Sequence, residues 1–182
     1  MAQEKEIQSS YFLTEVKEER SGQGEVDYAN IIQLGFLLPH FILPDAFGKE
    51  FVLKQLIGRY NLILTFLHRL DCACTKSFLA KLKQNHGEIQ AHNGKLIAIS
   101  VDHPRILVNL IREMQIEFPI LYDAGQTAIR LYTVIDRHSV RKEPHPAFFL
   151  ADTLGVIRHK DISLGHAEQL SLPPLLNTLR EI

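Results

Sequence analysis

The chain has only two cysteines, Cys72 and Cys74, and these are the residues with the clearest chemical potential. A thiolate can attack a peroxide or a disulfide, provided that the pKa of the thiol falls from about 8.5 toward neutrality. Both cysteines follow an almost continuous apolar run at residues 62–67 and precede a stretch with helical spacing at residues 76–84. They therefore lie where a buried strand gives way to a helix, and a helix N-terminus stabilises a thiolate through its N–H groups and dipole.

We predict that Cys72 is the nucleophile and that Arg69 both lowers the pKa of its thiol and orients a peroxide oxygen. Asp71 opposes this effect when ionised, although it could instead serve as the helix N-cap. Cys74 is placed to resolve a sulfenic acid on Cys72 through a small, strained and easily reduced ring. The alternatives are an inert, buried Cys72, a Cys74 that points into the core, and an Arg69 that is solvated at the strand end.

Two cysteines could also bind a metal ion. A structural zinc site needs four ligands with recognisable spacing, and the histidines nearby in sequence, His68, His86 and His92, form no such pattern. We therefore expect no metal site and no cofactor.

Composition restricts the class of protein. The chain has 182 residues, of which 46% are hydrophobic, enough for a substantial core. A net charge of −1 without a basic cluster argues against nucleic acid and anionic membranes as partners. No apolar run approaches the roughly 18 residues of a membrane span, and the first residues do not resemble a signal peptide. With two cysteines one residue apart instead of a disulfide framework, we expect a cytoplasmic protein.

The first 30 residues differ from the rest of the chain. Residues 1–30 are rich in Glu, Lys, Gln and Ser, and the Ser-Gly-Gln-Gly stretch at residues 21–24 interrupts any helix there. We predict an N-terminal arm or tail followed by one domain at residues 31–182. The arm is either mobile or packs on a partner subunit, so a homodimer is possible.

From residue 35 onward, apolar runs alternate with turn residues. The expected elements are a hairpin at residues 41–53, a strand at 62–67 with its helix, a strand at 95–101, a helix from Pro104, a strand at 118–122, a helix at 127–131, strands at 147–150 and 156–158, and a helix from Pro173. This alternation predicts an α/β fold with a mixed, mostly parallel central sheet flanked by helices, preceded by a β-hairpin.

Short motifs between residues 35 and 158 occur in the order of a known family. They are Gly35, Pro39 and Phe41; Leu43, Pro44, Asp45 and Gly48; Phe66, Arg69 and Cys72; residues 97–102; residues 118–123; Tyr132 and Val134; residues 144–152; and Gly155, Ile157 and Arg158. With these motifs the chain resembles the alkyl hydroperoxide reductase / thiol-specific antioxidant family, the peroxiredoxin branch of the thioredoxin superfamily. The resemblance implies a thioredoxin-like fold.

The resemblance also implies a function: a peroxiredoxin-like antioxidant enzyme that reduces hydroperoxides at the expense of thiols, such as those of a thioredoxin-like protein. Where many relatives carry Cys-x-x-Cys, Cys72 takes the first position and Thr75 the second. Thr65 and Arg69 stand where typical peroxiredoxins have a proline and a hydroxyl residue, and the family's distant arginine falls near Pro146. Two alternatives stay open: a thiol–disulfide oxidoreductase without peroxidase activity, and a non-catalytic redoxin-fold binding protein.

Pro146 resembles the cis-proline that faces the active cysteine in thioredoxin-like proteins. We therefore predict a cis His145–Pro146 bond, which places His145 near Cys72, where its imidazole could stabilise the thiolate or move its proton. The alternative is a surface histidine in a loop stiffened by prolines. Together with Thr75, these two residues are the expected contacts of a small hydroperoxide or disulfide substrate.

Overall fold

The computed structural model describes residues 32–136 and 143–182. The arm expected at residues 1–30 lies outside the described residues, so the boundary at residue 31 stays a prediction. Strands and helices alternate as expected: β1 (Ile42–Pro44), β2 (Glu50–Val52), β3 (Asn61–Phe66), α1 (Ala73–Ala91), β4 (Gly94–Ser100), α2 (Pro104–Met114), β5 (Ile120–Tyr122), α3 (Thr127–Leu131), β6 (Ala147–Ala151), β7 (Ile157–Ile162) and α4 (Leu172–Glu181). Two short 3₁₀ helices, η2 (Leu53–Leu56) and η3 (Ala167–Gln169), complete the series.

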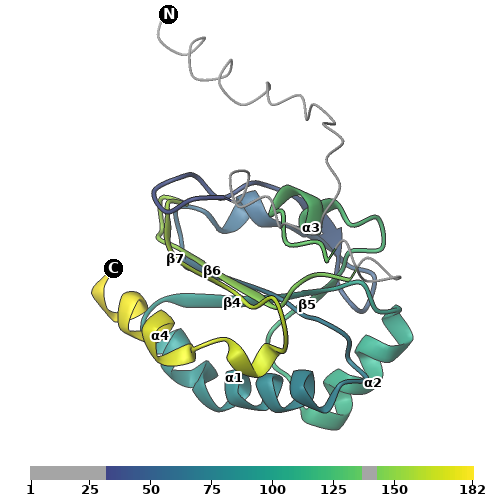
Figure 1. The fold of residues 1–182 in the computed structure, drawn as a ribbon. Helices are drawn as coiled ribbons and strands as arrows, with labels where there is room; N and C mark the ends of the chain where they lie inside the picture. The colour runs from purple at the N-terminus through teal and green to yellow at the C-terminus, as the bar shows by residue number, and fades with distance from the viewer. Residues whose placement is uncertain (1–31, 137–142) are drawn as a thin grey trace, which may run out of the picture.

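The central sheet has five strands in the order β5-β4-β3-β6-β7 (Figure 1). The pairs β3–β4 and β4–β5 are parallel, whereas β6 is antiparallel to both β3 and β7. Four of the five strands therefore run in the same direction, which confirms the expected mixed, mostly parallel sheet. Strands β1 and β2 form a separate antiparallel hairpin, as expected.

Both faces of the sheet are covered. Helices α1, α2 and α4 lie on one face, and α3 with the β1–β2 hairpin lies on the other (Figure 1). All six residues of β3 are buried, because the strand is central and has a hydrophobic cluster on each side. This explains why its sequence is mostly apolar instead of alternating, with Asn61 and Thr65 as its two polar residues.

The second cluster contains a group of aromatic rings. The Tyr132 ring centroid lies 5.1 Å from that of Phe66 and 5.0 Å from that of Phe149. The Tyr132 hydroxyl donates a hydrogen bond to the Pro39 carbonyl oxygen at 2.8 Å. Burial raises the pKa of Tyr132 well above its ordinary value of 10.0. The rings thus connect the end of α3 to the central strands and to the segment before β1.

The carboxyl end of β7 differs from the prediction. It extends to Ile162, whereas the sequence predicted a strand only at residues 156–158. Three of the four added residues, His159, Lys160 and Asp161, are polar or charged, but the added residues pair with β6 along its length. Strand length is set here by the partner strand.

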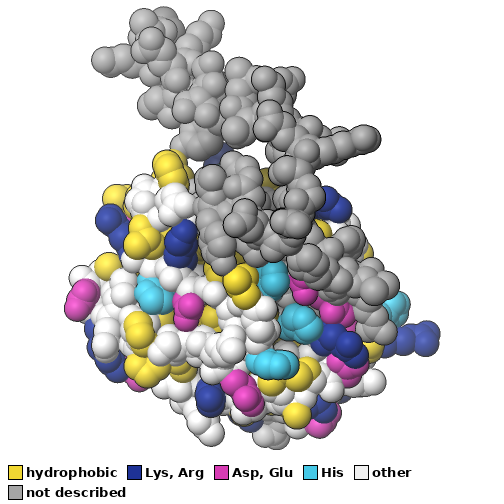
Figure 2. All heavy atoms as spheres, viewed as in Figure 1, with side chains coloured by type: hydrophobic (Ala, Val, Ile, Leu, Met, Phe, Trp, Pro, Cys, Tyr) yellow, Lys and Arg dark blue, Asp and Glu magenta, His cyan; other side chains and the backbone are white. Residues whose placement is uncertain are grey.

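The surface of the described part is mixed in character. Figure 2 shows acidic, basic, histidine and hydrophobic side chains interspersed on the face in view. Within the described ranges, no helix is both long and apolar enough to cross a membrane.

Candidate active site

The two cysteines lie between the carboxyl end of β3 and the start of α1. Cys72 is the N-cap residue of α1, and Cys74 belongs to its first turn. The Cys72 carbonyl oxygen accepts hydrogen bonds from the N–H groups of Thr75 at 3.1 Å and Lys76 at 3.3 Å. The predicted position of Cys72 at a helix start after β3 is therefore confirmed, and Cys72 occupies the N-cap position considered for Asp71.

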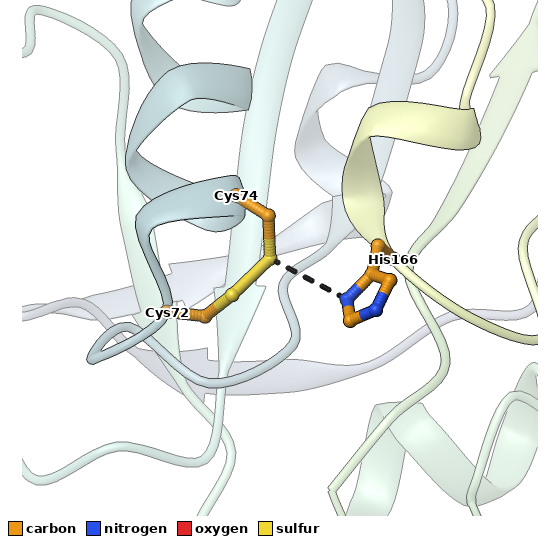
Figure 3. Close-up of side chains that lie close together, drawn as sticks. All are labelled: Cys72, Cys74 and His166. Atoms are coloured by element: carbon orange, nitrogen blue, oxygen red, sulfur yellow. Dashed lines mark hydrogen bonds between the residues drawn. A yellow bond between two sulfur atoms is a disulfide. The ribbon is translucent and has the colours of Figure 1, made fainter.

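Cys72 and Cys74 are joined by a disulfide bond (Figure 3). Both residues are partly buried, so the bond is accessible from one side. A Cys-x-Cys pair can thus close a ring in this fold, and the roles of Cys72 as nucleophile and Cys74 as resolving thiol stay predictions. The bond also shows that Cys74 reaches Cys72, as its predicted resolving role requires.

The loop before Cys72 is fixed by the end of β4. The Leu67 N–H donates to the Ile99 carbonyl oxygen at 2.9 Å, and the Leu70 N–H donates to Asp102 Oδ2 at 3.3 Å. Asp102 Oδ2 also accepts from the Ser100 hydroxyl at 3.1 Å. The neighbouring parallel strand therefore helps to position the turn that carries the cysteines.

Arg69 is held by carboxylates. Its Nε donates to Asp71 Oδ1 at 2.9 Å, and a second guanidinium nitrogen contacts the other Asp71 oxygen. Its Nε also lies 4.0 Å from Glu143 Oε1. The hydrogen bond to Asp71 is the main cause that raises the pKa of Arg69. Arg69 is exposed and paired with an exposed carboxylate, so Asp71 balances its charge beside Cys72, and its role toward a peroxide oxygen stays a prediction.

Sequence reasoning missed Glu143, a buried carboxylate that reaches the same loop. Its side chain is 6% exposed and its Oε2 lies 3.9 Å from His68 Nε2. No spacing connects residue 143 to residues 68 and 69, so only the folded chain brings them together.

The prediction of a cis His145–Pro146 bond is wrong, because the described residues contain no cis peptide bond. The Pro146 carbonyl oxygen accepts from the Ser163 N–H at 2.8 Å, just beyond the β6–β7 ladder. An extended chain that enters a strand in this way is compatible with the trans form, which X-Pro bonds prefer by about 0.5–1 kcal/mol.

His145 is buried, and its N–H donates to the Val134 carbonyl oxygen at 2.6 Å. The surface histidine of the alternative reading is therefore also wrong. The proposed roles of His145 and Pro146 as substrate contacts stay predictions.

Thr75 is fully buried in the first turn of α1. Its Oγ1 lies 4.0 Å from Cys74 Sγ. Thr75 therefore packs behind the disulfide, and its contact with substrate stays a prediction.

The histidine beside the cysteines is His166, which sequence reasoning missed. Its Nδ1 lies 3.9 Å from Cys74 Sγ (Figure 3). It precedes η3, and 92 positions separate it from Cys74 in the sequence. The only sequence signal was its place in a turn between the last strand and the last helix. An imidazole at this distance could exchange a proton with the Cys74 sulfur when the disulfide opens.

A groove of about 460 Å³ opens next to the cysteine turn. It lies between the start of α1 and one side of α2, and its lining is Leu70, Asp71, Lys76, Asp102, Ile106, Asn109, Leu110 and Glu113. The groove combines charged and apolar side chains, so it suits a small amphipathic molecule.

Residues 34–160, well over half of the chain, match the family model described as the AhpC/TSA family. The thiol-disulfide oxidoreductase ResA of Bacillus cereus is 28% identical over 140 residues, covering 76% of this chain and 75% of that protein. Peroxiredoxin Bcp of Escherichia coli is 25% identical over 134 residues, covering 71% of this chain and 85% of that protein.

Solved structures give the same result for the fold. Peroxidoxin BcpB from Mycobacterium tuberculosis aligns with a TM-score of 0.74 at 21% identity, over 83% of this chain and 98% of that one. Thiol peroxidase from Chromobacterium violaceum aligns with a TM-score of 0.71 at 20% identity, over 84% of this chain and 88% of that one. These matches confirm the expected thioredoxin-like fold.

Proposed function

Because the chain belongs to the AhpC/TSA family, we propose that it reduces hydroperoxides with Cys72 as the nucleophile. The protein is a peroxiredoxin-like redoxin and a thiol-dependent oxidoreductase, as the sequence resemblance predicted. The identity of its substrate, of its reductant and of its catalytic residues is part of the proposal.

The observation that carries the proposal is the Cys72–Cys74 disulfide at the N-terminus of α1. The first N–H groups of a helix have no intrahelical acceptor, so they stabilise negative charge at this point. That environment favours the thiolate of Cys72, which the reaction consumes.

The reaction proceeds in two steps before reduction. The Cys72 thiolate attacks one peroxide oxygen, the O–O bond breaks, and the departing oxygen takes a proton and leaves as an alcohol or water. Cys72 becomes a sulfenic acid, which the Cys74 thiol attacks, so that water leaves and the disulfide forms. An external dithiol then reduces the disulfide and is itself oxidised.

The groove beside the cysteine turn supports a small organic hydroperoxide as substrate. Leu110 and Ile106 offer apolar contact, and Lys76 offers a charge at the edge nearest the helix start. A thioredoxin-like protein is the proposed reductant, because the disulfide is partly exposed. An antioxidant role and a cytoplasmic location belong to the same proposal.

A second candidate function is thiol–disulfide exchange without peroxide reduction. Arg69, the expected donor to a peroxide oxygen, is hydrogen-bonded to Asp71 and lies close to Glu143. Preorganised donors aimed at the departing oxygen typically contribute about 100-fold or more in rate. A disulfide substrate, whose leaving thiolate is larger and softer, depends less on a donor such as Arg69, and this favours the second candidate.

The test is stopped-flow oxidation of the fully reduced chain by cumene hydroperoxide and, separately, by a small model disulfide. We expect Cys72→Ser to abolish oxidation by both. Cys74→Ser should leave the first oxidation by peroxide intact and accumulate a protein that has gained one oxygen atom by mass.

The rates of oxidation by the hydroperoxide and by the disulfide distinguish the candidate functions. Saturable oxidation by the hydroperoxide, faster than by the disulfide, supports the peroxidase. Oxidation by the disulfide alone would support the exchange enzyme and refute the peroxidase. No reaction with either oxidant would favour the non-catalytic redoxin, and loss of the first oxidation in Cys74→Ser alone would reverse the roles of the two cysteines.

A further inference from the structure

Three side chains at the active site carry donor atoms that metal ions bind. Cys72 Sγ, Cys74 Sγ and His166 Nδ1 lie within 4.8 Å of one another (Figure 3). The cysteines come from the start of α1, and the histidine comes from the turn before η3. The expectation of no metal site does not hold against this cluster, because His166 is far from the cysteines in sequence and joins them only in the folded chain.

The histidine is held in place by its own turn. The Ser163 hydroxyl contacts the His166 carbonyl oxygen at 2.9 Å and Gln169 Oε1 at 2.6 Å, and it accepts from the Gly165 N–H at 3.2 Å. The next residue, Ala167, is buried in the core, and η3 packs against α1. The backbone that carries the imidazole is therefore fixed relative to the cysteines, although the ring itself is exposed.

The distances fit a tetrahedral ion once the sulfurs are separated. Zn–S bonds of about 2.3 Å and Zn–N bonds of about 2.0–2.1 Å place tetrahedral ligands roughly 3.5–3.8 Å apart. Cys74 Sγ and His166 Nδ1 are already 3.9 Å apart. Reduction breaks the bond between the two sulfurs and lets them move apart to this spacing. The Cys74–His166 pair therefore needs almost no adjustment, and Cys72 Sγ, which lies within 4.8 Å of the imidazole nitrogen, closes the remaining distance.

The chemical nature of the three donor atoms determines which metal ion this site prefers. Two thiolates and an imidazole are soft to borderline ligands, which favour Zn²⁺ over Mg²⁺ or Ca²⁺. Two thiolates neutralise the charge of Zn²⁺, so the ion can bind near a helix N-terminus despite the positive end of the dipole. Three protein ligands leave one tetrahedral position open to water, an arrangement that occurs in zinc proteins with two cysteines and one histidine.

We propose that the reduced protein binds one Zn²⁺ through Cys72, Cys74 and His166, and that the ion is lost when the disulfide forms. The ion leaves first, and the two freed thiolates, one hydroperoxide and two protons then give the disulfide, one alcohol and one water. The thiolates lose two electrons and the O–O bond gains them. Bound zinc engages the lone pair of Cys72, so zinc and substrate compete for the same sulfur.

The experiment uses the full chain without a histidine tag. Zn²⁺ is titrated against a chromophoric chelator, first with the reduced and then with the oxidised protein. We expect one zinc per reduced chain and none per oxidised chain. Co²⁺ in place of Zn²⁺ should give the charge-transfer absorption of thiolate ligands in the reduced protein only.

Single substitutions test which side chains bind the zinc ion. Cys72→Ser, Cys74→Ser and His166→Asn should each weaken zinc binding at least about tenfold, because even changes behind the ligands cost 10- to 100-fold. His92→Asn is the matched control, since His92 is an exposed histidine at the other end of α1. Circular dichroism of each variant establishes that it is folded.

Equal zinc binding by the oxidised protein, or wild-type affinity in folded His166→Asn, would refute the site. The inference does not depend on peroxide turnover, which is measured separately in the presence of a chelator. Loss of zinc binding with normal peroxide kinetics refutes only the metal site, and zinc binding without peroxide turnover refutes only the peroxidase.

Discussion

At the scale of single residues, the charge beside Cys72 is set by two neighbours that oppose each other. Asp71 directly precedes Cys72, the proposed nucleophile, and its carboxylate is hydrogen-bonded to Arg69. Both side chains are substantially exposed, at 60% for Asp71 and 45% for Arg69, so water and salt weaken their fields. The reactivity of Cys72 therefore depends on the balance of this ion pair as well as on the helix.

Neutralising Asp71 should make the reduced enzyme more reactive. In Asp71→Asn, Arg69 loses its main partner and a negative charge disappears next to Cys72, so the thiolate fraction of Cys72 rises. We expect iodoacetamide to alkylate the reduced variant about 2- to 5-fold faster than wild type near neutral pH. Arg69→Ala should be alkylated more slowly than wild type, because it removes a positive charge near Cys72 and so lowers the thiolate fraction.

Glu88→Gln is the control for this change, because it removes a carboxylate at the far end of α1, where Glu88 pairs with Arg180. Its alkylation rate should equal that of wild type. A slower reaction in Asp71→Asn would mean that the carboxylate helps Cys72, for example by holding the loop, and not through its charge.

At the scale of elements, the end of α3 contains a strained residue. The Val134 N–H donates to the Ile129 carbonyl oxygen at 3.1 Å, and the Thr133 N–H donates to that of Arg130 at 3.1 Å. These two bonds form a Schellman motif, in which the residue after the C-cap is left-handed and usually glycine. Here that residue is Thr133, with a φ of 54°. A β-branched side chain is unfavourable in this conformation.

Thr133→Gly should therefore stabilise the protein. The left-handed conformation costs a non-glycine residue about 1–2 kcal/mol, which the glycine variant avoids. Part of this stabilisation is offset, because glycine has more backbone freedom to lose when the chain folds. We expect the free energy of unfolding in urea to rise by about 0.5–1 kcal/mol. Thr133→Ala keeps a Cβ in the same conformation and should show no such gain. Destabilisation by glycine would indicate that contacts of the threonine side chain outweigh its backbone strain.

At the scale of the whole molecule, two histidines connect stability to pH. Burial, opposed by Asp161, lowers the pKa of His159 below its ordinary value of 6.5. Partial burial and the charge of Lys54 lower the pKa of His40 in the same direction, although His40 is exposed and solvent screening makes its effect the weaker one. Within the described part of the chain, the buried Nε2 of His159 has no hydrogen-bond partner. The fold therefore favours the neutral form of both residues.

The unfolded chain binds protons more readily than the folded one at these two positions. The contribution of these two histidines to the free energy of unfolding is therefore fully present above about pH 6.5. It is lost as the pH falls from about 6.5 through the lower pKa that each histidine has in the folded state. We expect the urea midpoint to be lower at about pH 5.5 than at about pH 7.5. His159→Leu removes one of the two groups and should reduce this difference, and an unchanged difference would exclude His159 as a source of the acid sensitivity.

Local sequence determined much of this protein. The buried β3, the helix start at Cys72 and the order of strands and helices followed from apolar periodicity, turn residues and helix-end chemistry, all of which act over a few neighbouring residues. The family resemblance added the thioredoxin-like fold and the role expected of Cys72. Alternation of elements then sufficed to predict a mixed, mostly parallel sheet, because parallel strands need crossover helices.

Only the tertiary structure decided which distant side chains meet at the site. His166 lies beside Cys74 because the chain after β7 returns to the start of α1, across 92 positions of sequence. Glu143 likewise reaches Arg69 only in the folded chain, and the bond before Pro146 is trans. Such contacts depend on how packed layers bring loops together, and a pattern read along a single segment carries no information about them.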